Sequence, residues 1–391
     1  MARDAVIVAA VRTPTGKRGG GLAGVHPVDL SATVLDALVA RTGLDPALVD
    51  DVIWGCVSQT GEQAVNVARN AVLAAGWPET VPGVTLDRQC GSSQQALHFA
   101  AAGVISGQYD VAVAGGVELM SRVPMLCTVT QGPGVPFGPR MDARYDGFVF
   151  DQGQGAEKIA ARWGLSRADV DRIALRSHEL AAAAADSGAF DAEITPVRTA
   201  AGEVRADEGI RRGGSMASLA ELRTVFRADG VVTAGNASQI SDGAAALLVT
   251  SSERAAELGW TPLARVVATA VVGVDPVTML TGPIPATAAV LKRAGLAVSD
   301  IGAFEVNEAF ASVIGAWWAE VEKAGDLDRG ELEARTNPLG GAIALGHPLG
   351  ASGARLATTL VHHLQRTGAR HGLQVMCEGG GMANATILER L

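Results

Sequence analysis

The sequence is poor in cysteine and has no long apolar segment. Four cysteines in 391 residues are too few and too scattered for the disulfide scaffold of a small secreted domain, so we expect a reduced protein. No apolar run approaches the roughly 18 residues of a membrane span. The N-terminal run Ala5–Ala10 is also too short for a secretory signal. These absences predict a cytoplasmic protein without a membrane span.

Charge is also scarce, and its sign restricts the partners. Charged residues make up 19% of the chain and hydrophobic residues 48%, a balance that excludes general disorder. The net charge of -9 repels nucleic acid and anionic membranes, so an anionic small ligand must be met locally. One stretch contains five arginines: Arg205, Arg211, Arg212, Arg223 and Arg227. This stretch is either a phosphate-facing loop or a solvated surface loop.

Glycine, by contrast, is abundant. The 48 glycines make up about 12% of the chain, against a typical usage of about 7%. Tight turns and backbone that lies close to a ligand are the usual reasons for such enrichment. The length of 391 residues exceeds the roughly 100–200 residues of one domain. We therefore expect two or three units, or one large fold built from repeated halves.

Short apolar runs alternate with helix-period segments, which is typical of an α/β protein. Strands are expected at residues 5–10, 52–57, 110–114, 264–272, 304–306 and 374–377, and helices near 63–75, 91–105, 155–163, 167–185, 285–294, 309–321 and 354–364. The alternation stops after residue 119, where proline, glycine and polar residues dominate. We predict an N-terminal half at 1–119, completed by about 238–263, an inserted loop domain at 120–237 and a C-terminal half at 264–391.

The two ends of the chain resemble each other. A turn of small residues opens a helix and leads to a strand that ends in glycines, first around Cys90 and again around Ala351. Aligning these two residues places Ala114 against Val375, each 24 positions further along the chain. This similarity predicts an internal duplication.

Four residues stand at positions suited to chemistry. Cys90 directly precedes a predicted helix, whose dipole and free N–H groups favour a thiolate nucleophile, although cysteine is also commonly buried and inert. His347 lies in a loop with four glycines and two prolines, which brings a titratable group near a ligand. Cys377 opens a glycine-rich turn whose amides suit an oxyanion. Asn307 follows another strand, where asparagine is first of all a helix N-cap.

Jointly, these residues and their neighbours resemble the motifs of the thiolase family, the acetyl-CoA C-acyltransferases and acetyltransferases. The resemblance covers nearly the whole chain and rests on Gln89-Cys90-Gly91-Ser92, Gly235-Asn236-Ala237-Ser238 with Ser241-Asp242-Gly243-Ala244, Asn307-Glu308-Ala309-Phe310, Gly340-Gly341-Ala342-Ile343-Ala344-Leu345-Gly346-His347-Pro348, and Cys377-Glu378-Gly379-Gly380-Gly381. It implies the thiolase fold, in which two duplicated βαβαβαββ core halves form a five-layered αβαβα sandwich with an inserted loop domain.

The resemblance also implies catalytic roles. Cys90 matches the acyl-accepting nucleophile, and His347 matches the base that deprotonates it. Cys377 matches the second cysteine, which exchanges a proton with the α-carbon of acetyl-CoA. Asn307, through a held water, and His347 would form one oxyanion hole. The backbone N–H groups of Cys90 and Gly379 would form the other.

Coenzyme A thioesters are the implied substrates, with no permanently bound cofactor and no metal. In the family pattern Ser238 contacts the pantetheine, and the pantetheine tunnel is lined by Ala237, Ala234, Met279 and Phe310. The candidates for the 3′-phospho-ADP end lie in the arginine-rich stretch and include Arg211, Arg212 and Arg223. The family further implies a homodimer or a homotetramer built as a dimer of dimers, with residues 125–145 as a contact segment.

We therefore predict reversible thiolytic cleavage of 3-ketoacyl-CoA by CoA, which yields acetyl-CoA or propionyl-CoA and a shortened acyl-CoA, or the reverse Claisen condensation. Two departures from the family favour β-oxidation of fatty acids or steroid side chains over acetoacetyl-CoA synthesis. Asp151-Gln152 stands where short-chain biosynthetic enzymes carry a His-Met pair, and Met382-Ala383-Asn384-Ala385 replaces a further glycine.

Three other interpretations remain open. A decarboxylating β-ketoacyl synthase needs no α-proton base, so Cys377 speaks against it. A non-catalytic carrier or scaffold protein usually lacks a catalytic residue, and this chain has all four. A zinc site made from Cys90, Cys377 and His347 lacks the paired ligand spacing of structural zinc.

Overall fold

The ten-stranded main sheet lies at the centre of the computed structural model, which describes residues 3–325 and 327–391. Residues 1, 2 and 326, which belong to the predicted N- and C-terminal halves, lie outside the described residues. The strands of the sheet are β1 (Val6–Arg12), β2 (Gly16–Lys17), β3 (Asp51–Gly55), β4 (Gly83–Leu86), β5 (Val111–Leu119), β8 (Ser241–Thr250), β9 (Ala264–Gly273), β10 (Ile301–Val306), β11 (His371–Glu378) and β12 (Met382–Arg390).

The strand order β10-β11-β12-β9-β1-β8-β5-β3-β4 contains one pattern twice. β3 runs parallel to β5, β5 antiparallel to β8, and β8 antiparallel to β1. β10, β11, β12 and β9 repeat the same sequence of parallel, antiparallel and antiparallel pairs. The halves join where β1 meets β9, through Val6 with Arg265 and Ile7 with Ala264. The predicted duplication is confirmed.

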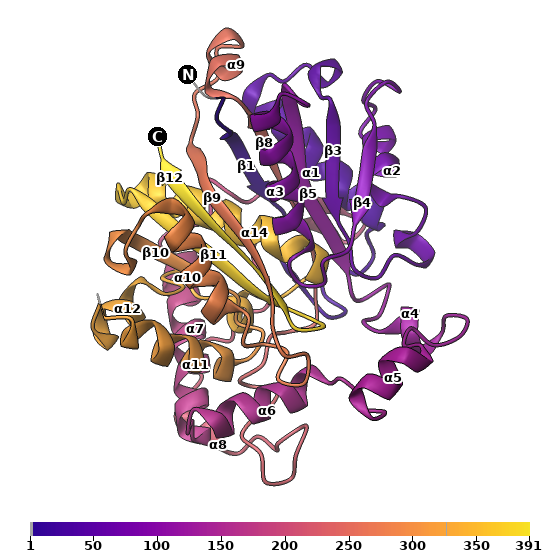
Figure 1. The fold of residues 1–391 in the computed structure, drawn as a ribbon. Coiled ribbons are helices and arrows are strands. Elements are labelled where there is room, and N and C mark those ends of the chain that lie inside the picture. The colour runs from indigo at the N-terminus through magenta and orange to yellow at the C-terminus, as the bar shows by residue number, and fades with distance from the viewer. Residues whose placement is uncertain (1–2, 326) are drawn as a thin grey trace.

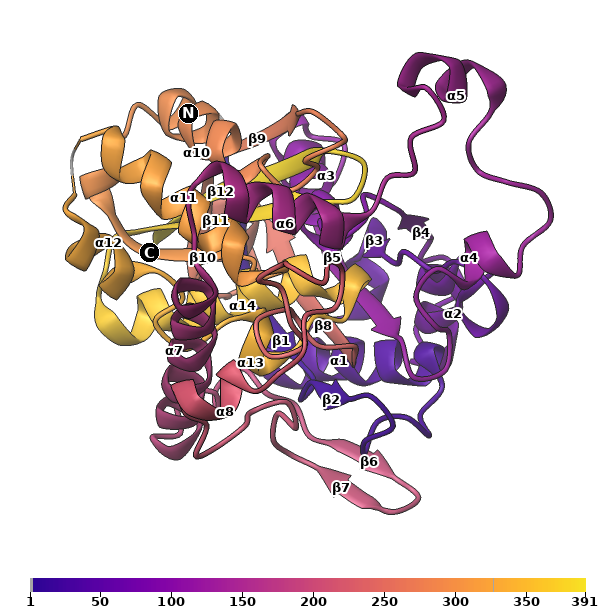
Figure 2. The same cartoon turned by 90° about the horizontal axis from the view of Figure 1, so that it is seen from below.

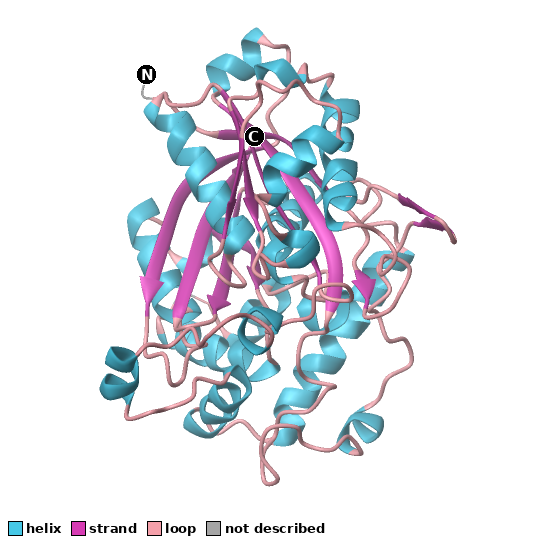
Figure 3. Cartoon of the chain, turned by 90° about the vertical axis from the view of Figure 1, so that its right-hand side faces the viewer, coloured by secondary structure: helices cyan, strands magenta, loops and turns pink. Residues whose placement is uncertain are grey.

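Helices cover both halves of the sheet and fill the space between them (Figures 1 and 3). The helices are α1 (Pro27–Thr42), α2 (Val67–Ala74), α3 (Ser92–Ser106), α4 (Cys127–Thr130), α5 (Pro139–Tyr145), α6 (Gln152–Arg162), α7 (Arg167–Asp186), α8 (Met216–Ala220), α9 (Ser252–Glu257), α10 (Pro283–Ala294), α11 (Ala311–Lys323), α12 (Arg329–Arg335), α13 (Ala342–Leu345) and α14 (Leu349–Thr367). None of these helices of the described residues is both long and apolar enough to cross a membrane.

Three apolar clusters define five layers. One cluster packs α1 and α2 against the outer face of the first half, for example Leu30 and Val72 against Val113. A second packs α10 and α11 against the outer face of the second half. The third joins both halves through the central helices α3 and α14, with Leu97 and Leu360 among its members. The predicted αβαβα sandwich is therefore confirmed.

Two predicted boundaries were wrong for identifiable reasons. α2 begins at Val67 instead of residue 63, because residues 61–63 form a 3-10 turn and Val65 and Asn66 have left-handed φ angles of 57° and 56°. α14 begins at Leu349 instead of residue 354. The small residues that predict a turn lie inside this helix. They are small because α3 packs closely there, and a Cβ on Gly353 would overlap with the backbone of Gln94 in α3.

Residues 120–240 form most of the structure outside the two sheet halves. α6 and α7 pack against α11, beside the lower ends of the strands in Figure 1. α4 and α5 project from the body, as does the small hairpin of β6 (Val197–Thr199) and β7 (Gly202–Val204) in Figure 2. These segments thus lie over the end of the sheet at which β11 and β5 finish.

Candidate active site

Cys90 lies in a tight turn that opens α3. The preceding Gln89 has a left-handed φ of 48°, an uncommon conformation for a residue with a side chain. The turn is closed by Ser92, whose hydroxyl accepts from the Arg88 N–H at 2.9 Å and donates to the Gln89 carbonyl. Cys90 is buried. The local sequence thus presents the thiol at the N-terminus of α3, as predicted.

Cys377 and Gly379 approach the same place from the end of β11. The Gly379 N–H donates a hydrogen bond to the Cys90 sulfur. The Asn307 side chain donates to the Cys377 sulfur, and Cys90 lies close enough to raise the pKa of Cys377. The structure therefore brings together Cys90, Cys377, Asn307 and Gly379.

His347 joins this group through a rigid loop. Gly346 has a φ of 93°, and a Cβ there would overlap with the Ser241 hydroxyl, which accepts from the His347 N–H at 3.1 Å. The imidazole Nε2 lies 3.4 Å from Asn307 Nδ2. The side chain thus faces the amide that also contacts Cys377.

The other imidazole nitrogen determines the tautomer of His347. Nδ1 lies 2.5 Å from the Ser352 hydroxyl, and that hydroxyl already donates its proton to the Pro348 carbonyl at 2.8 Å. Ser352 therefore acts as the acceptor, and Nδ1 carries the proton. This leaves a lone pair on Nε2, the atom that a general base needs.

Burial controls the ionisation of all three titratable groups. It raises the pKa of Cys90 to about 12, with a further rise from the Glu378 carboxylate. It also raises the pKa of Cys377, to which the nearby Cys90 adds. Burial and the charge of Arg355 lower the pKa of His347 to about 3. All three groups are thus neutral near pH 7, and the expected thiolate at Cys90 is wrong for the unliganded protein, because desolvation outweighs the helix N-terminus.

Two buried carboxyl groups hold the site together. Glu118 accepts hydrogen bonds from the N–H groups of Val57, Ser58 and Gly350, which ties β5 to the start of α14. Glu308 accepts from Ser177, Asn337 and the Ile343 N–H. The sequence analysis assigned no role to either. Glu308 stands beside Asn307 in its motif, whereas nothing in the local sequence distinguishes Glu118.

The residues expected around pantetheine separate into two groups. Met279, Phe310 and the partly buried Ala237 belong to the same apolar cluster as Cys377. Ser238 adjoins them and donates its N–H to the Ala309 carbonyl at 2.9 Å. Ala234 is exposed and lies outside this cluster.

The three arginines expected at the phosphates are all exposed. Arg212 forms a two-pronged ion pair with Asp186, with both N···O distances at 2.8 Å. The backbone N–H of Arg211 donates to His178 at 3.1 Å, so the Arg211 guanidinium takes no part in that bond. Arg223 precedes the Thr224–Thr233 bridge. None of the three arginines belongs to the apolar cluster that contains Cys377.

The acyl-side departures have local structural roles. Asp151 is the N-cap of α6 and accepts from the Gln154 N–H at 2.8 Å. Asn384 on β12 donates weakly to Gln95 of α3, at 3.4 Å. Across residues 3–325 and 327–391, no group of three or more His, Cys, Asp or Glu side chains is arranged to hold a metal ion.

Comparison with known proteins identifies the family. Residues 5–253 match the thiolase N-terminal domain and residues 260–390 the thiolase C-terminal domain. The chain is 50% identical to the steroid 3-ketoacyl-CoA thiolase FadA6 of Mycobacterium tuberculosis, over 99% of this chain and 94% of the relative. It is 46% identical to a 3-ketoacyl-CoA thiolase of Escherichia fergusonii, over 99% of both chains.

A solved structure agrees with these matches. The crystal structure of the Bacillus anthracis acetyl-CoA acetyltransferase superposes with a TM-score of 0.90 at 40% identity, and the match covers 100% of this chain and 99% of that one. Family, fold and full-length coverage all agree, and the chain therefore belongs to the thiolase family.

Proposed function

We propose that this protein is a degradative thiolase, which cleaves 3-ketoacyl-CoA with CoA to acetyl-CoA or propionyl-CoA and a shortened acyl-CoA. The observation that carries the proposal is the approach of two buried thiols, Cys90 and Cys377, with Asn307 hydrogen-bonded to the second thiol and 3.4 Å from Nε2 of His347. One thiol alone suits acyl transfer, whereas a second thiol beside it supplies the proton exchange at carbon that C–C cleavage requires.

In the first half-reaction Cys90 gives its proton to Nε2 of His347 while its sulfur attacks the 3-keto carbon. The C2–C3 bond then breaks, and the electron pair moves to C2 of the leaving acetyl-CoA. Cys377 protonates this carbon, so an acyl group remains on Cys90. Because both pKa values oppose charge separation in the unliganded site, we expect proton transfer and attack to occur together.

In the second half-reaction CoA gives its thiol proton to the Cys377 thiolate and attacks the acyl carbon. Cys90 leaves as a thiolate and recovers its proton from His347, while the CoA proton replaces the one that Cys377 gave to acetyl-CoA. Both cysteines and His347 thus return to their starting protonation states. Negative charge develops on two different carbonyl oxygens during the cycle. The Cys90 and Gly379 N–H groups suit one oxygen, and His347 with Asn307 suits the other.

The substrate proposal rests on the relatives. The Mycobacterium tuberculosis relative is named a steroid 3-ketoacyl-CoA thiolase, and the Escherichia fergusonii relative is named a 3-ketoacyl-CoA thiolase. We therefore propose acyl chains longer than that of acetoacetyl-CoA. The carrier and β-ketoacyl synthase alternatives are not favoured, since the residues of both proton-transfer steps are present. The biosynthetic alternative is not favoured, since both curated relatives named above are 3-ketoacyl-CoA thiolases.

For CoA we propose that residues 120–237 form the binding segment, with Ser238, Ala237, Met279 and Phe310 along the pantetheine. The location of Ala237, Met279 and Phe310 beside Cys377 supports this. Arg211 and Arg223 are better candidates for the phosphates than Arg212, whose guanidinium is engaged by Asp186. No permanently bound cofactor or metal enters the proposed reaction.

We further propose a cytoplasmic homodimer or homotetramer. β4 is an edge strand that exposes Val84, and α3 exposes Phe99 and Ile105, so unpaired backbone and apolar side chains are available to a second copy. All four cysteines are free, which suits a reducing compartment.

Mass spectrometry of the protein mixed with an acyl-CoA tests the central step. We expect an acyl adduct on Cys90 in the natural protein and none in Cys90→Ser. An adduct on another residue, or no adduct, would contradict the nucleophile. A thiolysis panel from C4 to steroid-sized 3-ketoacyl-CoAs tests the substrate, and activity confined to C4 would contradict the degradative proposal.

The variant Cys377→Ala separates the two thiols. It should still form the adduct on Cys90, because the acylation of Cys90 by a simple acyl-CoA needs no proton at C2. It should lose exchange of deuterium from solvent into the methyl group of acetyl-CoA. Retained exchange would remove Cys377 as the proton donor.

A further inference from the structure

The carboxyl group of Glu378 is buried beside the nucleophile and has no place in the reaction proposed above. Glu378 is the last residue of β11 and is 0% exposed. Neither Oε1 nor Oε2 has a hydrogen-bond partner among the described residues. Leaving a buried polar group without a hydrogen bond destabilises the folded protein, so such groups are rare and need an explanation.

Strand alternation directs this carboxyl group toward Cys90. Cys377 packs with Met279 and Phe310 on one face of β11, whereas Met376 packs with Cys90 on the other. Glu378 shares the face of Met376, because side chains two residues apart point the same way. A Cβ on Gly91 would overlap with Glu378 Oε1, so the carboxyl group lies against the residue that follows Cys90.

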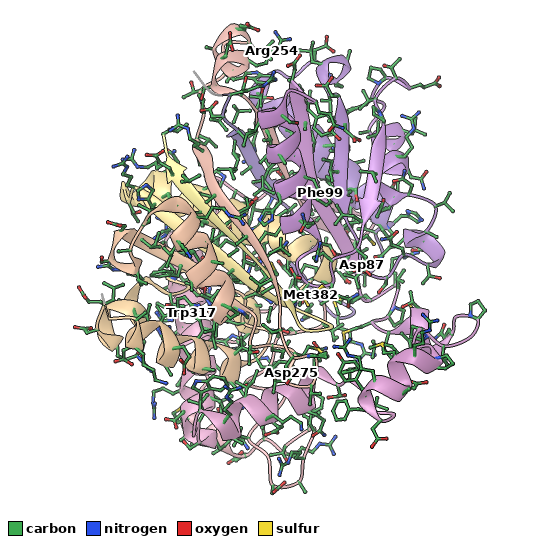
Figure 4. The ribbon with its side chains drawn as sticks, in the orientation of Figure 1. Asp87, Phe99, Arg254, Asp275, Trp317 and Met382 are labelled. Atoms are coloured by element: carbon green, nitrogen blue, oxygen red, sulfur yellow. The ribbon has the colours of Figure 1, made fainter. Side chains whose placement is uncertain are left out.

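The groups around Glu378 come from three elements. Arg88 and Asp87 lie in the turn before α3. The charge of Arg88 lowers the pKa of Glu378, and the charge of Asp87 raises it. Met382 of β12 stands opposite Glu378 in the sheet, and its sulfur lies 3.6 Å from Nη1 of Arg88. Figure 4 labels Met382 and Asp87. Cys90 and Cys377 are the other titratable neighbours, since the Glu378 charge raises the pKa of both thiols. Burial raises the pKa of Glu378 to about 8, so the group is an uncharged acid near neutral pH.

We propose that Glu378 is a positioning residue for the nucleophile, whose buried carboxyl group controls whether Cys90 can carry negative charge and so sets the upper pH limit of acylation. The role in acylation rests on the proposed function. As an acid, Glu378 offers an O–H donor beside a sulfur that becomes negative. As a carboxylate, it places a like charge beside that sulfur. Glu378 keeps its own proton throughout, since the proton of Cys90 moves to His347.

Alkylation of Cys90 by iodoacetamide tests this inference without any CoA substrate. The reagent is neutral and reacts with the thiolate, so its rate reports the charge state of the sulfur. Site-resolved mass spectrometry separates Cys90 from the other three cysteines. The rate is measured between pH 6.5 and pH 10 for the natural protein and for Glu378→Gln, which retains the shape and an N–H donor but never becomes charged.

Near pH 7 we expect the two rates to agree within about threefold. Above pH 8 the rate of the natural protein should level off, because Glu378 ionises, while that of Glu378→Gln continues to rise. At pH 9.5 the variant should react about tenfold faster, the size expected for removal of one nearby charge at partial burial. Equal pH profiles for the two proteins would overturn the proposal.

Glu305→Gln is the matched control. Glu305 is also a buried glutamate with a pKa raised to about 8 by burial and an unpartnered Oε2, but its charge does not act on Cys90. Its profile should follow the natural protein, and a profile like that of Glu378→Gln would overturn the specific role of Glu378. Glu378→Asp keeps the charge, so it should keep the levelling above pH 8 even if Glu378→Gln is unstable.

The test separates this inference from the proposed function. Loss of thiolysis in the natural protein would remove the thiolase assignment, whereas the alkylation profile would still report on Glu378 and Cys90. Conversely, equal profiles would remove the role of Glu378 and leave the acyl adduct on Cys90 untouched.

Discussion

At the scale of single residues, the site depends on hydrogen bonds that fix protons. Ser352 contacts no substrate in the proposed reaction, yet its hydroxyl assigns the proton of His347 to Nδ1. Asn307 links the lone pair on Nε2 to the Cys377 sulfur. The base and the second thiol are therefore oriented by the same amide, and neither needs a charge in the unliganded protein.

Removal of the Ser352 hydroxyl should lower turnover. In Ser352→Ala the imidazole loses its Nδ1 partner, so both tautomers become accessible, and we expect kcat to fall about tenfold, the equivalent of one hydrogen bond of about 1.4 kcal/mol. Steady-state thiolysis kinetics measure this. Ser312→Ala, which removes another buried hydroxyl bond, to the Ala156 carbonyl, is the control and should leave kcat unchanged. Equal losses in both variants would contradict the role of Ser352.

Buried histidines should make the protein sensitive to acid. Burial lowers the pKa of His98 to about 3, against an ordinary value of 6.5. Its contribution to stability is complete above pH 6.5 and is lost as the pH falls toward 3, because the unfolded chain takes up the proton first. At pH 5 the loss in unfolding free energy is about 2 kcal/mol. We therefore expect His98→Gln to reduce the difference in unfolding free energy between pH 7 and pH 5 by about that amount, measured with urea. If His98→Gln showed the same difference between pH 7 and pH 5 as the natural protein, the lowered pKa of His98 would be contradicted.

At the scale of elements, the central helices α3 and α14 determine where the chemistry lies. Cys90 lies at the start of α3, and His347 lies two residues before α14. The packing of Cys90 against Leu349 of α14 thus brings the proposed nucleophile and the proposed base together. Small residues make that packing possible, since a Cβ on Gly353 would overlap with the Gln94 backbone of α3. The start of α14 also lies close to the sheet, since a Cβ on Gly116 of β5 would overlap with the Gly350 carbonyl.

Two glycine substitutions within helices should have opposite effects. Gly353→Ala forces α14 away from α3, and we expect a loss of about 1–3 kcal/mol in unfolding free energy together with reduced kcat. Gly330 lies in α12, where a Cβ meets only Asp328 at 3.4 Å. Gly330→Ala should therefore stabilise by about 0.5–1 kcal/mol, because alanine favours the helix. Denaturant titration measures both, and equal signs would contradict the packing argument.

The element scale also shows where local sequence was sufficient. β1 and α7 were predicted to within two residues, because a short apolar run and a helix-period segment are local signals. The start of α14 was not predicted, because Gly350 and Gly353 signal a turn locally. These glycines are helical because the elements packed against them require small residues there.

At the scale of the whole molecule, two copies of one α/β pattern share a central layer, and the edge strand β4 remains uncovered. Apolar side chains are exposed beside it on α3, including Phe99, which Figure 4 labels. Such a surface is a candidate for contact with a second copy of the chain.

A charged substitution should therefore change the oligomeric state. We expect the natural protein to elute as a dimer or tetramer and Val84→Lys/Phe99→Glu to be a smaller species, because lysine and glutamate oppose edge pairing and apolar burial. Size-exclusion chromatography with light scattering measures the mass. Leu73→Lys, which changes an exposed apolar residue of α2, is the control. A monomeric natural protein would contradict the proposed assembly.

The sequence by itself determined the α/β class and the duplication, and it predicted the site residues Cys90, Asn307, His347 and Cys377, because spacing, glycine turns and motifs are local properties of the chain. Only the tertiary structure decided the charge states, since desolvation comes from side chains distant in sequence. It also revealed Glu118 and Glu378, whose contacts with Gly350 and Gly91 exist only after β5, β11 and the two central helices meet. The bond between Ser352 and His347 is local and arises because α14 begins at Leu349. Burial, which no local pattern encodes, thus converted an expected thiolate into a neutral thiol with a carboxyl group beside it.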